Sequence, residues 1–240
     1  MPQTSNAISR VAWLLAILSV AATVLTLVLA FDLTGAPPSV SETADFPTAI
    51  LSTQAFVQSR WPIDFLGSLL FAVVFALIAL LGALLSGRTG RVEVLGLLMA
   101  GGILGMASQL TYVGAHQVAV AMPYCDCGFK TEEIISQTWG LMLIDGVADW
   151  LLNGAAVLLA SGVVYAGAAL AGRGMPAAWR TLSWAMAFVL LLGVVVSGIG
   201  IDGPVGPLLI AVVTGLLLPI WAVWLAERLP DDAPVDAATT

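Results

Sequence analysis

Long apolar runs without any Asp, Glu, Lys or Arg alternate along the chain with polar segments. There are six such runs, each of 21 to 24 residues, at positions 11–31, 65–87, 94–115, 150–172, 181–201 and 203–226. A helix of about 20 residues crosses a hydrocarbon layer of about 30 Å. The strands of a membrane barrel would instead alternate apolar and polar residues, which these runs do not. The pattern therefore predicts an all-α fold, a polytopic transmembrane six-helix bundle that forms one membrane domain over residues 1–230.

The composition agrees with lipid as the main solvent of this chain. Of its 240 residues, 60% are hydrophobic and 10% are charged, whereas soluble domains carry about 25% charged residues. The formal net charge of −7 argues against a nucleic-acid partner, because nucleic acid requires a basic surface. The last stretch, residues 231–240, is polar and rich in Pro and Ala, and we expect it to be a disordered cytoplasmic tail.

The basic residues predict the orientation of the bundle. Six of them flank the spans on one side: Arg10, Arg88, Arg91, Arg173, Arg180 and Arg228. The other side carries only Arg60 and Lys130. The positive-inside rule then places both termini in the cytoplasm. Acidic residues collect on the opposite, outer side, which makes that face electronegative.

Polar residues gather at one depth, near the outer ends of three predicted spans. These candidate ligand-binding residues are Asp64, Gln109, Tyr112, Asp145, Asp149 and Asn153. The last three follow one another at intervals of four, so they share one helical face. Together they predict a shallow acidic pocket that opens to the outside and binds a small solute or cation. The alternative is that these residues are polar only because the headgroup region is wet.

The second outer loop carries the soft metal-ligand types of the sequence. His116, Met122, Cys125 and Cys127 lie within twelve residues. Imidazole, thioether and thiolate together suit Cu(I) or Zn, although structural zinc sites use a wider cysteine spacing. A disulfide, a metal site, a catalytic thiol and two free thiols all stay open for Cys125 and Cys127. No cofactor is otherwise expected.

Two further patterns concern packing. Gly101 and Gly105, and likewise Gly162 and Ala166, are small residues one helical turn apart, which lets neighbouring helices approach closely. We expect this approach within the bundle rather than across a dimer. Tryptophans near the span ends are typical of interfacial belts: Trp13, Trp61, Trp139, Trp179, Trp221 and Trp224.

Two short motifs resemble those of a bacterial protein family. They are the Arg60-Trp61-Pro62-Ile63-Asp64 start of the second span and the Arg173-Gly174-Met175-Pro176-x-x-Trp179 connection. In these motifs and in its layout the chain is similar to six-span integral membrane proteins of unknown function. The resemblance implies a multi-pass protein of the bacterial plasma membrane and carries over no active residue.

The sequence favours a non-enzymatic membrane component that binds or passes a small solute or cation at the outer pocket. The interiors of the spans hold no ionisable residue, and the chain has no Walker loop, His-Glu-x-x-His or Gly-x-Ser-x-Gly motif. One alternative is a membrane-embedded thiol or metal oxidoreductase that uses Cys125, Cys127 and His116. Another is an accessory subunit of a larger membrane complex, with a second membrane protein as partner.

Overall fold

A computed structural model of the chain describes residues 2–30, 46–121, 131–171, 174–199, 205, 209 and 212–229. These residues are almost entirely helical and include no strand. The elements are α1 (Pro2–Ala30), α2 (Phe46–Thr89), α3 (Val92–Ala121), α4 (Thr131–Ala171), α5 (Ala177–Gly198), the π-helical segment η1 (Val213–Leu217) and α7 (Leu218–Arg228). The predicted all-α membrane bundle is confirmed, with η1 and α7 forming the described part of the sixth helix.

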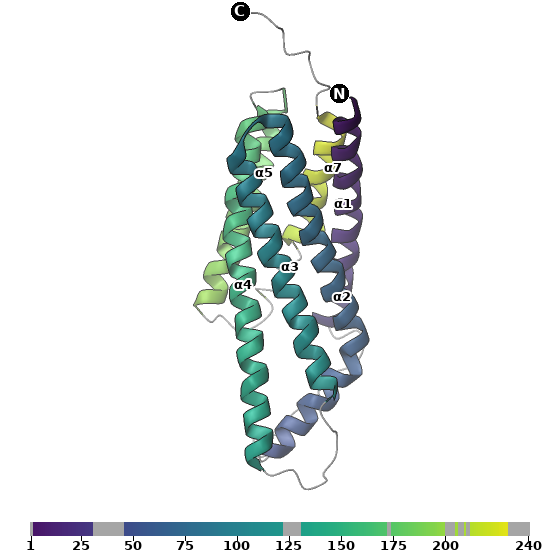
Figure 1. The fold of residues 1–240 in the computed structure, drawn as a ribbon, viewed down its shortest axis with the longest axis vertical. Coiled ribbons are helices and arrows are strands. Elements are labelled where there is room, and N and C mark those ends of the chain that lie inside the picture. Colours follow the sequence, from purple (N-terminus) through teal and green to yellow (C-terminus); the bar gives the residue numbers. More distant parts are fainter. Residues whose placement is uncertain are drawn as a thin grey trace, which may run out of the picture.

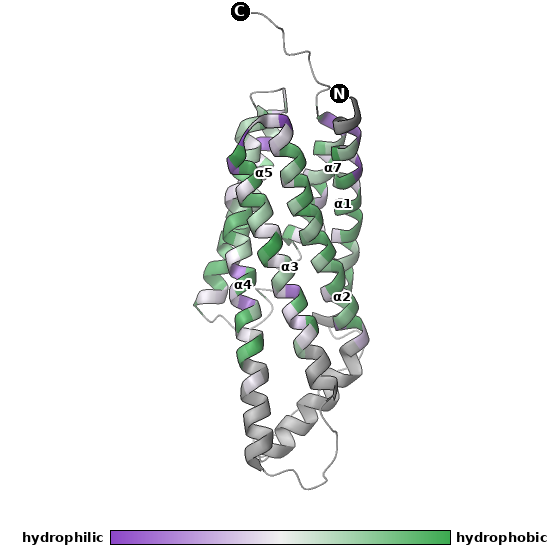
Figure 2. Cartoon of the chain, in the orientation of Figure 1, coloured by the Kyte–Doolittle hydropathy of each residue, from purple (hydrophilic) through white to green (hydrophobic). Residues whose placement is uncertain are grey.

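The bundle is a multi-pass membrane protein. Five described helices contain stretches long and apolar enough to cross a bilayer: α1, α2, α3, α4 and α5. Large apolar side chains also cover the outside of the bundle, as Ile17, Leu80 and Phe188 do, and Phe188 is 68% exposed. Figure 2 shows green, hydrophobic positions over the middle of the bundle, with hydrophilic positions at the N-terminal end and again across α3 and α4. Water would disfavour such a surface, whereas lipid accepts it.

The six helices form a ring. Each helix packs on the next in the order α1, α2, α3, α4 and α5, and α7 with η1 closes the ring between α5 and α1. Among the residues that the structure describes, the contact of α5 with the η1–α7 segment is the least extensive around this ring. The N-terminus and the end of α7 lie at the same end of the bundle, and α2, α3 and α4 project furthest at the opposite end (Figure 1).

Two helices are longer than their predicted spans. α2 begins at Phe46, 19 residues before the predicted span at position 65, and runs without a break through Pro62. α4 begins at Thr131, well before the predicted span at position 150. Hydropathy marks where a helix meets lipid, but a helix can continue into water wherever its backbone hydrogen bonds continue.

The sixth helix contains a π-helical segment next to Pro219. Pro219 has no backbone N–H, so it cannot donate to the carbonyl four residues earlier, in Gly215. Over Val213–Leu217 the helix has a π-helical hydrogen-bond pattern, in which the N–H of Leu218 donates to the carbonyl of Val213 five residues back. A proline inside a helix commonly causes a kink, and here it lies next to this π segment.

Hydroxyl groups join the π segment to α1. Thr23 Oγ1 and Thr214 Oγ1 are 2.7 Å apart, and Thr23 also donates to the carbonyl of Ser19 at 2.8 Å. The Ser19 hydroxyl donates to the carbonyl of Thr214. Ser19 and Thr23 are both buried, so the contact holds α1 against the sixth helix in the apolar interior.

The small residues pack inside the bundle, as the sequence predicts. A Cβ atom on Gly162 of α4 would lie 2.6 Å from the Leu98 side chain of α3. A Cβ on Gly105 of α3 would clash with the Phe75 side chain of α2. Gly162 and Gly105 therefore allow α3 to approach both of its neighbours closely.

The tryptophans depart in part from the predicted belt. Trp13 is 43% exposed, but Trp179 and Trp221 are 0% and 2% exposed and lie inside the bundle. Each indole N–H donates to an acceptor on another residue of the bundle. These two rings therefore do not need water at the membrane interface as an acceptor.

Candidate functional site

The predicted pocket residues surround one cavity of about 640 Å³ in the ring of helices. Five of the six line its wall: Asp64, Gln109, Tyr112, Asp149 and Asn153. Asp145 lies in α4 one turn before Asp149, and its side chain lies outside the described residues. Cavities of about 300–1,000 Å³ hold small organic ligands, so this volume is in that range.

The polar wall is built from three helices. Asp64 belongs to α2, Gln109 and Tyr112 lie one turn apart on α3, and Asp149 and Asn153 lie one turn apart on α4. Residues three or four apart share a helical face, and the packing of α3 between α2 and α4 brings the three faces together. The side chains thus line one cavity because they lie on facing sides of adjacent helices.

Hydrogen bonds order part of this wall. The Tyr112 hydroxyl donates to Asp149 Oδ1 and so joins α3 to α4. Asn153 Nδ2 donates to Ser197 Oγ of α5 at 3.3 Å. Ser108, which is buried next to Gln109 along α3, donates to the carbonyl of Ala148 at 2.8 Å. Asp149 is itself exposed, so the polar end of the cavity can be reached from outside the bundle.

Gln109 differs from its polar neighbours. Its residue is only 8% exposed, and it lines the cavity. An amide that borders a cavity can both donate a hydrogen bond to an occupant and accept one from it.

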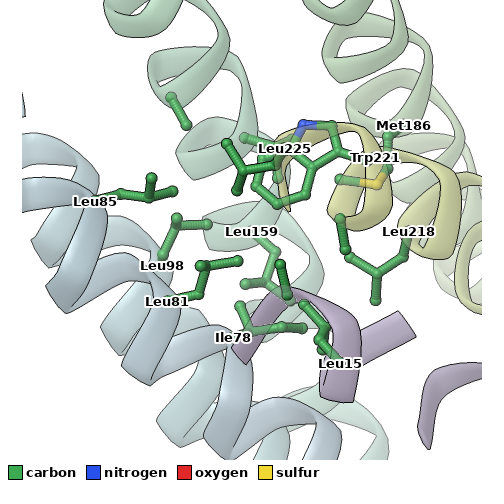
Figure 3. Close-up of a cluster of buried hydrophobic side chains, with 14 of the residues drawn as sticks. Leu15, Ile78, Leu81, Leu85, Leu98, Leu159, Met186, Leu218, Trp221 and Leu225 are labelled. Carbon is green, nitrogen blue, oxygen red and sulfur yellow. The ribbon is translucent and has the colours of Figure 1, made fainter. Parts of the chain in front are cut away.

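The other end of the cavity is apolar. Leu81 of α2, Leu98 of α3, Leu159 of α4, Met186 of α5 and Trp221 of α7 line it. Figure 3 shows these side chains converging from the different helices toward one centre.

The cavity stops at the next layer of side chains. Leu85 and Leu225 are fully buried one turn beyond Leu81 and Trp221, and they do not line the cavity. The apolar cluster thus closes the cavity toward the N-terminal end of the bundle.

The cavity is deeper than the predicted shallow pocket. Its lining on α2 extends from Asp64 to Leu81, which corresponds to about 25 Å along a helix. Sequence reasoning also missed four hydroxyl-bearing lining residues: Thr26, Ser68, Ser197 and Thr214. Single Ser and Thr residues in apolar runs are common packing residues, so only their depth relative to Asp64 and Asp149 could have identified them.

The electrostatic character of the cavity is acidic. Asp64 and Asp149 line it, and the lining residues that the structure describes include no Lys, Arg, His or Cys. A cationic group is therefore the charge that this wall favours.

The predicted Cys125 and Cys127 site lies outside the described residues, as does the side chain of His116, whose backbone belongs to α3. No protein-family model, curated protein or solved structure matches the chain.

Proposed function

We propose that this chain is a non-enzymatic binding protein of the bacterial plasma membrane that holds a small cationic solute at the polar end of its cavity. Both termini lie in the cytoplasm in this proposal, because six of the eight basic residues flank the spans on that side. The polar end of the cavity then faces outward.

One observation carries the proposal: carboxylate, amide and phenol groups from three helices converge on the wall of one cavity. Two unit charges 4 Å apart interact by about 1 kcal/mol in water and by about 4 kcal/mol at an effective dielectric constant of about 20. The interaction energy between a cation and Asp64 or Asp149 in this partly enclosed site lies between these two values. Gln109 and Asn153 would add hydrogen bonds that orient it.

Binding is favoured over passage across the membrane. The apolar cluster around Leu81 and Trp221 lines the inner end, and Leu85 and Leu225 are packed behind it. A bare cation has no polar partners there, and moving a charge into such surroundings is costly. The described geometry therefore supports a site that is open on one side.

The test is calorimetric titration of the purified chain with butylammonium, a small organic cation, and with butanol as its uncharged analogue. We expect Asp64→Asn and Asp149→Asn each to weaken butylammonium binding about tenfold, which corresponds to about 1.4 kcal/mol. The double variant, and a triple variant that adds Asp145→Asn, should bind more weakly still.

Glu93→Gln is the matched control, because Glu93 is an exposed carboxylate in the first turn of α3 and does not line the cavity. It should leave the titration unchanged. Undiminished butylammonium binding by the triple variant, or equal affinity for butanol in the unaltered protein, would refute the proposal.

A further inference from the structure

The shape of the cavity narrows the class of ligand, and this inference rests on the proposed function. The lining of α2 begins with Asp64, Gly67 and Ser68 and continues with apolar residues alone from Phe71 to Leu81. A small hydrated cation would occupy only the polar end. About two-thirds of the length of this α2 lining would then face no ligand atom.

An empty apolar space loses dispersion contacts along its whole wall, and it stays dry because water finds no partners there. A hydrocarbon chain is the occupant that suits such a wall. Burial of one methylene from water contributes about 0.8 kcal/mol. A hydrocarbon chain that is already dissolved in lipid gains much less free energy when it enters the cavity. The polar end of the cavity must therefore select the ligand within the membrane.

The polar end selects by charge and by hydrogen bonding. The Gln109 amide, in a residue that is 8% exposed and lines the cavity, can donate to or accept from a polar group next to it. Asp64 and Asp149 disfavour a phosphate or carboxylate head, since no basic side chain among the described lining residues would neutralise it. An ordinary anionic phospholipid therefore does not fit.

We propose that the ligand is a single-chain amphiphile with a primary amine head, held with its ammonium group at Asp64, Gln109 and Asp149 and with its chain extended toward Trp221. Such a molecule can come from the bilayer itself or from the outer aqueous phase, and the two sources share this chemistry.

The position of the chain can be tested by photo-cross-linking in lipid nanodiscs. The probes are two octadecylamines, one with a diazirine at the chain terminus and one with a diazirine next to the amine. We expect the terminal diazirine to label Leu81, Leu98, Met186 or Trp221, and the head diazirine to label Gln109 or Tyr112. Labelling confined to lipid-facing residues such as Leu80 and Phe188 would overturn the inference.

A cavity-filling variant supplies an independent readout. Gly193 lines the cavity, and a Cβ built on it meets no atom within 4 Å. Gly193→Leu should therefore fill the space without a clash and reduce terminal labelling at least tenfold. Gly96→Leu is the matched control, because Gly96 is equally open but exposed on α3 and outside the cavity wall. Gly67→Leu provides a second cavity-filling variant.

The outcomes separate this inference from the proposed function. If butylammonium binding depends on Asp64 and Asp149 but terminal labelling is diffuse or insensitive to Gly193→Leu, the cationic site stands and the chain-binding inference fails. If Asp64→Asn with Asp149→Asn changes neither butylammonium binding nor labelling, both fail. Faster labelling by probe incorporated in the nanodisc than by probe added to the buffer would identify the bilayer as the source, and the reverse order would identify the aqueous phase.

Discussion

Trp179 and Trp221 stack inside the bundle, with ring centroids 5.0 Å apart and an interplanar angle of 23°. Trp179 Nε1 donates to the backbone oxygen of Trp221 at 3.1 Å, and Trp221 Nε1 donates to Ser183 Oγ at 2.9 Å. Ser183 in turn donates to the carbonyl of Trp179 at 3.1 Å. This closed set of bonds joins α5 to α7 beside the apolar end of the cavity.

Loss of the Ser183 hydroxyl should destabilise this junction. Ser183→Ala leaves the buried indole N–H of Trp221 without its acceptor, and an unsatisfied buried donor costs about 1–3 kcal/mol. We expect a lower melting temperature by circular dichroism in mild detergent. Ser161→Ala is the control, because Ser161 bonds only the carbonyl four residues back within its own helix; an equal loss in both variants would contradict this role.

Two glycines on α3 should respond to alanine in opposite directions. A Cβ on Gly102 would meet the Phe75 oxygen and the Ala79 backbone nitrogen at 2.6 and 2.9 Å. Gly102→Ala should therefore force α2 and α3 apart and destabilise the fold by about 1–3 kcal/mol. Gly96→Ala meets open space and should stabilise the helix by about 0.5–1 kcal/mol. Thermal melts that shift in the same direction would refute the close approach of α2 and α3.

The hydroxyl contact between α1 and η1 predicts a cross-link. The hydroxyl oxygens of Thr23 and Thr214 are 2.7 Å apart, so Thr23→Cys with Thr214→Cys should oxidise to a disulfide once Cys125 and Cys127 have been replaced by Ser. Val24→Cys with Thr214→Cys should not, since Val24 is 53% exposed. Gel mobility with and without reductant measures both pairs.

The same pair of cysteines also tests the role of Pro219. Pro219→Ala restores the missing N–H and favours a regular α-helix in place of η1. The yield of the cross-link should then fall. An unchanged yield would show that the π segment does not depend on the proline.

The predicted orientation can be checked with reporter fusions. Alkaline phosphatase, which is active only outside the cytoplasm, should be inactive when fused after Arg91 or Arg173 and active when fused between residues 122 and 130. This orientation is expected because six basic residues flank the spans on the side that carries Arg91 and Arg173. The reverse pattern of activity would show the opposite orientation in the membrane, with the polar end of the cavity on the cytoplasmic side.

The cysteine loop supplies the test of the oxidoreductase alternative. We expect the chain purified in mild detergent to carry no stoichiometric Cu or Zn, because Cys-x-Cys is too short a spacing for a structural zinc site. Elemental analysis, combined with mass-spectrometric mapping of Cys125 and Cys127 before and after reductant, measures this. Stoichiometric metal or a reversible disulfide would support the oxidoreductase instead.

Much of the architecture could be predicted because lipid imposes a simple length rule. The apolar run at 65–87 lies inside α2, and the run at 150–172 contains the later part of α4, which ends at Ala171. The rule does not say how far a helix continues beyond lipid. Nothing in the hydropathy of Phe46 or Thr131 marks a helix start, and Pro62 suggests a break that α2 does not make.

The residues of the polar wall could be predicted because helical spacing shows which of them share a face. The four-residue spacing of Asp149 and Asn153 fixes one face of α4, and Gln109 and Tyr112 fix one face of α3. The apolar depth of the cavity could not be predicted in this way. Leu81, Leu98 and Met186 have the same hydropathy whether they face lipid, a neighbouring helix or a cavity, and only the packing of all six helices decides between these positions.

The length of α2 has a consequence for the position of Asp64. This helix has 44 residues and therefore measures about 66 Å along its axis, about twice the hydrocarbon thickness. Its first turns run obliquely across the end of the bundle where α4 also begins (Figure 1). Asp64 lies 18 residues after Phe46, which is about 27 Å along the helix, so a long stretch of α2 precedes this carboxylate and is not needed to cross the hydrocarbon layer.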